Sequence, residues 1–439
     1  MPTQMTLFAE GKPSKEFFID MLTRDIDLTS CVLDLLDNSV HSLVRHTGMD
    51  IMKTLTARKP QKPAKKGRVE ISLSKSRFSI LDNCGGVTLE DAQDELLRMG
   101  YPKTTPKVTG LGLYGIGMKR AFFKIGKQID FQSRSNGQGF RVPINVDVWR
   151  KKPDDWRFKI EPLPAEDAPK SGHTKIQISG LKKGVGERFA SPDFTKELVR
   201  KIGATYALFL KNGVQVQVNG TAVTPLLPTI ATKTFTASRK RFKQDGVDVL
   251  IIAGTTEGAD KVPRGWYIFC NGRMVIEADK TSLTGWGDNL PAFHSKYNHF
   301  VGYAYFRSKD LAALPWTTTK RGINTDSPIY QRALAEMRVE ARPILNFLNK
   351  LYPSDLEAEG VPERQVLKDA RPVTLDKLPK TRASFKSKPR KTKKETCVNV
   401  LLKRPRAEID KIRNALGKPQ LAAKRAVLHC IKYFLDKEC

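Results

Sequence analysis

Near the start of the chain, apolar positions first repeat with a helical period and then with the two-residue period of strands. Residues 16–45 read as two helices. The second helix carries apolar side chains on one face, at Val32, Leu33, Leu35, Leu36 and Val40. Residues 69–73 alternate between apolar and polar positions and residues 78–81 are nearly all apolar, which predicts a hairpin of two strands.

Further helices and strands complete this first unit. Thr88 is placed to cap a helix over residues 89–99, with Asp91 at its third position, and a second helix covers residues 118–125. Strands are expected at residues 128–131, 140–148, 158–160 and 174–178. The pattern predicts an α+β sandwich, in which helices cover one face of a mixed, largely antiparallel sheet.

A second unit follows a basic loop at residues 182–186. Its predicted elements are a helix at 194–210, a strand at 214–218 with a hairpin turn at Asn219–Gly220, strands at 247–252, 265–270 and 299–306, and a helix at 328–351. A segment rich in Pro, Lys and Arg then leads to a short helical tail at residues 409–436. We therefore expect domains at residues 1–185 and 186–352, a basic linker at 353–395 and a helical basic tail at 396–439.

Length and composition describe a globular protein of two to three domains. The chain has 439 residues, 40% of them hydrophobic. Its six cysteines show no Cys-x-x-Cys spacing, which predicts free thiols in a reducing compartment. Because no apolar run reaches about 18 residues and the N-terminus has no hydrophobic signal core, neither membrane insertion nor secretion is expected. The prediction is a cytoplasmic protein, with association with the nucleoid left open.

The charge balance points to a polyanionic partner. Lys and Arg number 76 against 46 Asp and Glu, a formal net charge of +30. Residues 371–439 alone hold 20 Lys and Arg against 6 Asp and Glu, a net +14. Since aromatic residues do not alternate with these cations, the tail is expected to contact nucleic-acid phosphates without reading bases. A tail that only improves solubility is the alternative.

The stretch Asp34-Leu-Leu-Asp-Asn38 is the first candidate for chemistry. In a helix, the four-residue step places Asp34 and Asn38 on one face, one turn apart. A carboxylate can polarise an attacking water, and an amide oxygen suits Mg²⁺. Asp37 is the next candidate for the base, although it lies about 100° around the helix from Asn38. In isolation, the pentapeptide is also compatible with a solvated helix face.

Two glycine-rich segments add a place for phosphates. Asp82 ends the strand at 78–81 and precedes Gly85 and Gly86, which suits either a tight turn or a loop facing a ligand. Glycines at 110, 112, 115 and 117 open the helix at 118–125, where free amides and Lys119 suit a polyphosphate. A dinucleotide loop fits poorly, because no strand runs directly into these glycines and no ribose-binding acid follows at the usual spacing.

A Gly-His-Thr step at residues 172–174, entering a strand, is the fourth segment. In this order, the four resemble the ATP-binding module shared by DNA gyrase, the ninety-kilodalton heat-shock chaperone, sensor histidine kinases and MutL, the GHKL family. The resemblance covers residues 15–185 and is closest to the MutL and MORC-like branch. It implies a Bergerat-type sandwich that binds ATP with Mg²⁺.

The resemblance also implies roles for residues. Asp34 is the base, and Asn38 holds Mg²⁺. Asp82 binds adenine, with Thr174 supporting it and an ordered water. Gly86, in the loop after Asp82, also binds the nucleotide. Gly112, Gly115 and Gly117 form the glycine-rich edge of the lid, and Lys119 near them is the cation already expected to suit a polyphosphate.

Three positions depart from the family pattern. Asp34 stands where the family has Glu, Cys84 where it has Gly, and His41 where an acid often follows the Asn. A base shorter by one methylene and an altered adenine loop predict slow turnover more than lost binding.

The second unit resembles the family's transducer domain, of the ribosomal S5 type, through its strand, Asn271-Gly-Arg273 turn and strand. In that family a transducer lysine reaches the γ-phosphate. Lys320 stands at the matching position, with Arg321 as the alternative. A basic turn that only solvates its loop would give the same sequence.

These features predict a slow ATPase that works as a nucleotide-switched dimeric clamp on DNA, in genome maintenance or defence. The partners expected are DNA, bound without sequence preference, and a second copy of the chain on ATP binding, with no membrane. The alternative is a chaperone-like or signalling GHKL ATPase acting on a partner protein, with the tail serving solubility or RNA. A histidine kinase is disfavoured because no dimerising helix with a phosphoacceptor His precedes the module. A strand-passing topoisomerase would need a cleavage domain.

Overall fold

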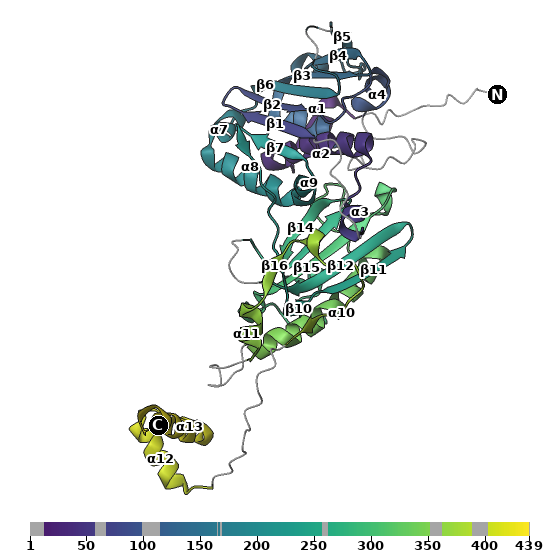
Figure 1. Ribbon diagram of the computed structural model, residues 1–439. Helices are drawn as coiled ribbons and strands as arrows, with labels where there is room; N and C mark the ends of the chain where they lie inside the picture. The colour runs from purple at the N-terminus through teal and green to yellow at the C-terminus, as the bar shows by residue number, and fades with distance from the viewer. Residues whose placement is uncertain are drawn as a thin grey trace, which may run out of the picture.

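The computed structural model (Figure 1) describes residues 13–57, 67–98, 115–164, 166, 169–256, 262–351, 362–388 and 403–438. Two sheets dominate these residues. An eight-stranded sheet with its helices forms the first body, and a five-stranded sheet backed by a long helix forms the second. Both are built from strands that alternate with or precede helices, so the α+β class is confirmed.

The first sheet has the strand order β5-β4-β3-β6-β2-β1-β7-β8. Its strands are β1 (Arg68–Leu73), β2 (Arg77–Asp82), β3 (Gly126–Ser135), β4 (Gln138–Asn145), β5 (Glu161–Pro162), β6 (His173–Leu181), β7 (Gln215–Val218) and β8 (Thr221–Ala222). Every pair is antiparallel except β1 with β7. Buried and exposed positions alternate along β1, β2 and β6, so one face of the sheet is covered.

The helices of this body are α1 (Lys15–Thr23), α2 (Leu28–Thr47), α3 (Ile51–Thr56), α4 (Leu89–Asp91), the π-helix η1 (Ala92–Leu96), α5 (Gly117–Ile125), α6 (Val146–Arg150), α7 (Val185–Ala190), α8 (Pro192–Thr205) and α9 (Ala207–Lys211). α2 packs against α5, which also contacts β3 and β6. Asp27 caps α2 by accepting from the amide of Ser30, and Gly48 ends it in the left-handed conformation. The central helix is thereby fixed at both ends.

The second sheet has the order β11-β12-β15-β13-β14. Its strands are β11 (Ser238–Gln244), β12 (Val247–Thr255), β13 (Trp266–Cys270), β14 (Arg273–Asp279) and β15 (Phe300–Arg307). The short 3₁₀-helices are η2 (Ser282–Thr284), η3 (Ser295–Tyr297), η4 (Leu311–Ala313) and η5 (Leu375–Lys377). Helix α10 (Pro328–Leu351) packs along β12 and β15, and β12 is buried along its whole length. The long central strands therefore have cover from the helix.

Several predictions about elements need correction. Residues 146–148 are helical in α6 and not strand, because the Asn145 side chain caps that helix. The short strand follows residues 158–160 and is β5. The helix after Thr88 keeps its predicted cap, but it turns into the π-helix η1 after Asp91. The predicted helix 194–210 is two helices, broken at Tyr206.

The predicted linker is also partly folded. The elements there are α11 (Pro362–Lys368), β16 (Arg371–Val373) and β17 (Lys386–Ser387), and β16 and β17 pair with β9 (Ile230–Thr232) and β10 (Phe235–Thr236). Phe385 packs against the rings of Phe235 and Phe347. Residues 362–388 thus belong to the second body. The tail holds two helices, α12 (Arg406–Ala415) and α13 (Ala423–Glu438).

The first sheet continues past residue 185, where the sequence predicts a domain boundary. β7 pairs with β1 in register, with Val216 opposite Val69. The predicted two-residue hairpin is confirmed, since Asn219 and Gly220 both have positive φ and connect β7 to β8.

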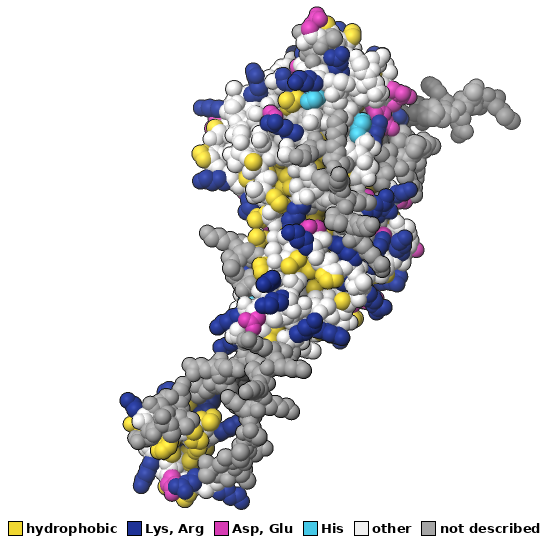
Figure 2. Space-filling model, in the orientation of Figure 1, with side chains coloured by type: hydrophobic (Ala, Val, Ile, Leu, Met, Phe, Trp, Pro, Cys, Tyr) yellow, Lys and Arg dark blue, Asp and Glu magenta, His cyan; other side chains and the backbone are white. Residues whose placement is uncertain are grey.

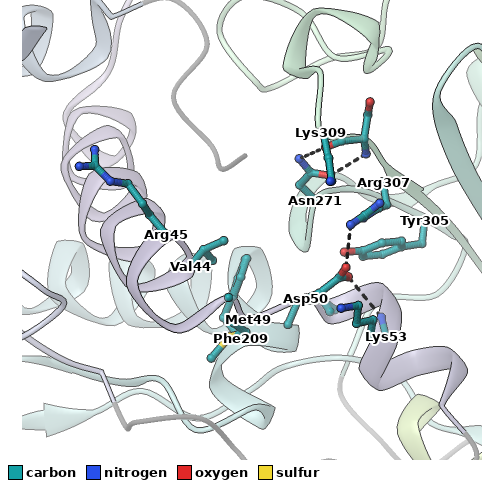
Figure 3. Close-up of a pocket in the computed structure, with 13 residues that line it drawn as sticks. Val44, Arg45, Met49, Asp50, Lys53, Phe209, Asn271, Tyr305, Arg307 and Lys309 are labelled. Atoms are coloured by element: carbon teal, nitrogen blue, oxygen red, sulfur yellow. Dashed lines mark hydrogen bonds and ion pairs between the residues drawn. The ribbon is translucent and has the colours of Figure 1, made fainter. Parts of the chain in front are cut away.

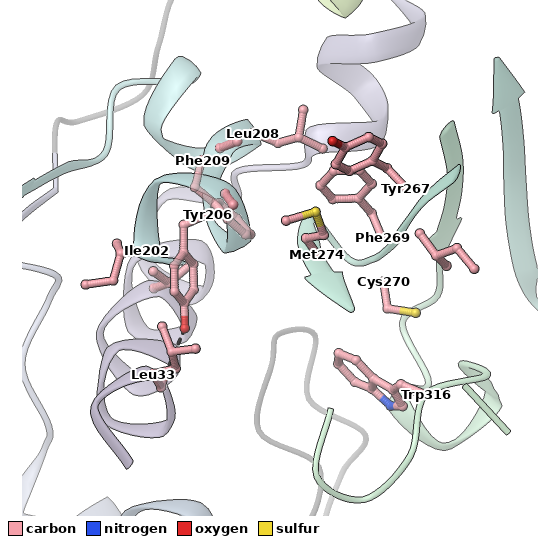
Figure 4. Close-up of a cluster of buried hydrophobic side chains, with 14 of the residues drawn as sticks. Leu33, Ile202, Tyr206, Leu208, Phe209, Tyr267, Phe269, Cys270, Met274 and Trp316 are labelled. Atoms are coloured by element: carbon pink, nitrogen blue, oxygen red, sulfur yellow. Dashed lines mark hydrogen bonds between the residues drawn. The ribbon is translucent and has the colours of Figure 1, made fainter. Parts of the chain in front are cut away.

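Buried side chains join the two bodies. Figure 4 shows Tyr206 and Leu33 from the first body beside a cluster with Phe269 and Met274 from β13 and β14. Gly272, in the turn between those strands, lies so close to Phe209 that an added Cβ would stand 2.7 Å from its ring. Among the described residues, no helix is both long enough and apolar enough to cross a membrane.

Candidate functional site

Helix α2 carries Asp34, Asp37 and Asn38, and these three side chains differ in their exposure to solvent. Asp34 and Asp37 are buried, at 3% and 1% exposure, whereas Asn38 is exposed in a helix that is otherwise covered there. The exposure of Asn38 leaves its amide oxygen accessible to a ligand. The Asp34 and Asn38 side chains lie on one side of the helix, as their spacing predicts.

Asp34 forms an ion pair with α5. The Nε and Nη2 atoms of Arg120 both lie 2.7 Å from Asp34 Oδ2. Gly117, at the start of α5, packs directly over this carboxyl group, because an added Cβ would stand 3.4 Å from its Cγ. Only one oxygen of Asp34 is used by Arg120, so the other remains available to a water molecule.

Asp82 lies in a row of polar side chains across three strands. It faces Thr174 on β6, and Thr174 faces Ser133 on β3, all on the covered side of the sheet. The hydroxyl groups of Thr174 and Ser133 are 3.0 Å apart. The structure therefore brings together Asp82 and Thr174, which the sequence predicts, and adds Ser133.

The Asp82 carboxyl group is held from two sides. Ser39 of α2 donates its hydroxyl to Oδ2 at 2.6 Å, and the amide of Cys84 donates to Oδ1 at 2.9 Å. Burial raises the pKa of Asp82, and these two hydrogen bonds oppose the shift. Ser39 is the residue after the exposed Asn38. One turn of α2 therefore carries both the predicted Mg²⁺ ligand and the residue that holds Asp82.

The two glycines after Cys84 permit close backbone approach. Gly85 has φ +125° and an added Cβ would stand 2.2 Å from the His46 ring. Gly86 has φ +72°, with Arg134 O at 2.4 Å from such a Cβ. The positive φ disfavours a side chain at both positions, and at Gly86 the Arg134 carbonyl also leaves no space for one.

Helix α5 begins at Gly117 beside Asp34, and Ile116 at its N-cap makes no side-chain cap. Gly115 has φ +61°, and Gly112 lies outside the described residues. The Lys119 ammonium donates to the carbonyl of Gly115 and is 3% exposed, and burial lowers its pKa to about 8. In this conformation the Lys119 ammonium binds a carbonyl one helical turn before it, so a phosphate role for Lys119 stays a prediction.

A buried ionic network centres on Asp37. Arg273 Nε lies 2.8 Å from Oδ1 and Lys320 Nζ lies 2.8 Å from Oδ2. Tyr206 donates its hydroxyl to Oδ1 at 2.6 Å. Burial would raise the pKa of Asp37, but Arg273 and then Lys320 lower it below its usual value. With both oxygens taken, Asp37 is not free to act as a base.

The two cations of the second body differ in their surroundings. Lys320 is bound to Asp37, and its backbone has φ +56°. Arg321 reaches only Asp27, at 3.6 Å, and its Nε and Nη2 are buried without a hydrogen-bond partner among the described residues. Burial lowers the pKa of Arg321, and of the charges that oppose this shift Asp34 acts most strongly, followed by Asp27. The sequence alternative Arg321 thus lies near the predicted base.

His41 lies within helix α2, three residues after Asn38. Burial lowers its pKa to about 4, with Lys320 and Arg45 acting in the same direction. His41 is therefore neutral at physiological pH. A neutral imidazole adds no negative charge where the family often has an acid.

These groups fit the ATP and Mg²⁺ that the sequence predicts. Asp82 supplies a buried acceptor, Asn38 an exposed oxygen, and Gly117 leaves space beside Asp34. The buried, unpartnered nitrogens of Arg321 suit an anion. No group of three or more His, Cys, Asp and Glu residues gathers to hold a metal within the described ranges, so a magnesium ion here would rely on Asn38, phosphate oxygens and waters.

Comparison with known proteins agrees with this geometry. Residues 26–173 match the family model described as histidine kinase-, DNA gyrase B-, and HSP90-like ATPase. The match supports the GHKL family. The matched range contains the α2 residues, Asp82 and α5, and it ends one residue before Thr174. Among curated proteins, none matches the chain.

The GHKL match supports ATP binding and hydrolysis, and GHKL proteins usually bind ATP with Mg²⁺. The sequence missed five residues that the structure adds around the site. They are Ser39, Arg120, Ser133, Tyr206 and Arg273. Ser39 and Arg120 sit within predicted helices, so helical spacing pointed toward them, whereas no signal linked Arg273 to Asp37 across 236 positions.

Proposed function

We propose that this protein is a slow, ATP-switched dimeric clamp of the MutL and MORC-like branch that associates with DNA. One observation carries the nucleotide part. The exposed Asn38 lies one turn from the buried Asp34 and next to Ser39, which holds the buried Asp82. A metal-side amide, a water-polarising acid and an adenine-side acceptor thus come from one stretch of α2 and one strand end.

Each residue has a proposed role. Asp82 accepts the adenine amino group, and Thr174 with Ser133 keeps its surroundings polar. Asn38 offers its oxygen to Mg²⁺, which when bound neutralises phosphate charge. Asp34 orients a water through the oxygen that Arg120 leaves free. An acid already paired with arginine is a weaker base, which supports slow turnover.

The second body supplies the switch. Lys320 and Arg273 reach into the first body and meet Asp37, the residue before Asn38. Any movement of α2 that accompanies nucleotide binding therefore acts on contacts of the second body. Arg321 has two nitrogens, Nε and Nη2, without a hydrogen-bond partner among the described residues, and it is the proposed contact to the terminal phosphate if Lys320 stays on Asp37.

The charge distribution supports a nucleic-acid partner. On the face shown in Figure 2, Lys and Arg side chains spread from the first body to the tail, and acidic side chains are few. Cations that are not concentrated in one pocket suit the phosphate backbone of a long polyanion. This pattern favours DNA over the alternative of a protein client.

Light scattering with and without a nonhydrolysable ATP analogue tests the proposed function. We expect a monomer or loose dimer without nucleotide and a stable dimer with it, across micromolar protein concentrations. Retention on DNA, measured in the same samples at rising salt, should increase with dimer formation. An unchanged mass with the analogue would refute the clamp. DNA retention that does not change with salt concentration would refute binding to the phosphate backbone of DNA.

A further inference from the structure

A cavity lies between the two bodies, and neither Asp82 nor the start of α5 lines it. It has a volume of about 260 Å³. Figure 3 shows Val44 and Arg45 of α2 on one side, and Tyr305 and Arg307 of β15 with Asn271 on the other. Asp50 and Lys53, at the start of α3, lie beside Arg307 and Tyr305. Its walls therefore come from the same two bodies that the Asp37 network joins elsewhere.

The cavity has an excess of positive charge. Four of its lining residues are cations, Arg45, Lys53, Arg307 and Lys309, and Asp50 is the one acid among the lining residues. Asp50 is already paired, because Arg307 Nη2 lies 2.9 Å from its Oδ2.

Two of these cations remain for a ligand. Arg45 is held by Asp91, outside the cavity, at 2.7 Å. Lys53 and Lys309 are exposed, and within the described part of the chain neither has an ion-pair partner. The charge of Lys53 and Lys309 is thus uncompensated at the rim.

The rest of the cavity is apolar or rigidly held. Val44, Met49 and Phe209 line one part of it. The rim on the opposite side is fixed, since Asn271 donates to the carbonyl of Ser308 at 2.9 Å and accepts from its amide at 3.0 Å. A preformed rim lowers the ordering cost of binding.

We propose that this cavity binds a nucleotide phosphate, either free or at the end of a nucleic-acid strand. The phosphate lies between Lys53 and Lys309, and the apolar part of the ligand contacts Val44, Met49 and Phe209. The volume is near the lower end of small-molecule pockets, roughly 300 Å³, which suits one nucleotide unit and not a larger cofactor. Because the walls belong to both bodies, the ligand bridges them.

Calorimetric titration of thymidine monophosphate into the full chain tests the site. The chain carries Asp82→Asn, which is expected to abolish binding at the ATP site, so that any binding measured belongs to the cavity. We expect Lys53→Gln with Lys309→Gln to lower affinity about tenfold, since each lost cation contributes a few-fold. The control is Lys243→Gln with Lys386→Gln, which removes two exposed lysines outside the cavity and should leave affinity unchanged.

Further arms separate the two sources of the ligand. A thymidine hexamer with a 5′-phosphate, compared with the same hexamer ending in a hydroxyl, shows whether a strand end enters. The site is supported if the monophosphate or the phosphorylated end binds and only the Lys53 and Lys309 variant loses it. Equal loss in the control pair, binding of inorganic phosphate as tight as that of the nucleotide, or binding of neither nucleotide form would overturn the proposal.

Discussion

The ammonium of Lys320 lies 2.8 Å from the Asp37 carboxylate, across 283 positions of sequence. Asp37 also receives Arg273 at 2.8 Å, and Arg273 donates in turn to the carbonyl of Lys320 at 2.7 Å. Three residues from both bodies thus form a closed set of contacts, in which Asp37 and Arg273 are buried and Lys320 is partly exposed. The position of α2, the helix that carries Asn38, is therefore fixed in part by Arg273 and Lys320 of the second body.

Replacing Asp37 by Asn should therefore be far more damaging than replacing Lys320 by Met. The first change leaves the buried Arg273 charge without its partner, at a cost of about 3–5 kcal/mol. The second leaves Asp37 paired with Arg273 and should cost about 1–2 kcal/mol. Urea unfolding measures both, with Lys243→Met on exposed β11 as the control. Equal losses for the two variants would contradict a network centred on Asp37.

Asp82→Asn should abolish nucleotide binding. The change turns one acceptor oxygen into a donor inside a site where Ser39 and the Cys84 amide already donate. We expect a loss of about 2–4 kcal/mol in binding free energy, measured by calorimetric titration of an ATP analogue. Asp130→Asn is the matched control, because Asp130 faces away from the covered side of the same sheet and pairs with Arg141. Wild-type affinity in Asp82→Asn would remove Asp82 from the adenine site.

Asp34→Asn should keep nucleotide binding and slow hydrolysis. The variant retains the shape of the side chain but loses the ability to accept a proton from water, an effect of about 10²-fold or more. Single-turnover hydrolysis at saturating ATP measures it, and nucleotide affinity is the internal control. If the rate is unchanged, the base lies elsewhere and is not Asp37, whose oxygens are both engaged.

Sequence predicted most of the first body because its signals are local. Neighbouring residues decide the hairpin of β1 and β2, helix α5, the cap at Thr88 and the turn at Asn219–Gly220. The row of Asp82, Thr174 and Ser133 needed strand register, which sequence alone did not supply for Ser133. Register decides which side chains face one another, and a shift of one residue would reverse it.

The error in the predicted linker has a physical cause. Residues 362–388 read as a linker because they are rich in Pro, Lys and Arg, yet Phe385 and Leu375 find apolar partners on the second body. Tertiary contacts there override the local composition.

The low pKa of Lys119 gives a prediction for pH dependence. Its folded pKa of about 8 lies below the unfolded value near 10.5, so burial penalises the charged form. The penalty is fully present below pH 8 and is relieved as pH rises from 8 to 10.5, where the unfolded chain binds more protons. Lys119→Met should therefore be more stable than wild type at pH 7, by about 1–3 kcal/mol, with the difference shrinking toward pH 10.5. Urea unfolding of both proteins across this range tests it, and a difference that is constant with pH would contradict the assignment.

Removal of the chain after Lys388 should weaken DNA binding and leave the nucleotide site intact. The deleted residues hold 14 Lys and Arg against 5 Asp and Glu, a net +9. We expect the densest phosphate contacts at residues 388–394, of which only Lys388 lies within the described residues. This end point keeps β16, β17 and Phe385, whose packing a cut after residue 370 would destroy.

Counterion release gives a slope of about −0.9 in log affinity against log salt for each phosphate contact on duplex DNA, so the shortened chain should show a flatter slope. Titration of a fluorescent duplex at several salt concentrations measures that slope, and ATP-analogue affinity in the same preparation is the control. If the shortened chain keeps the full slope, the contacts belong to the two bodies, and the tail helices α12 and α13 serve another partner. Their exposed Leu428, Ile431 and Phe434 would then be the surface to test first.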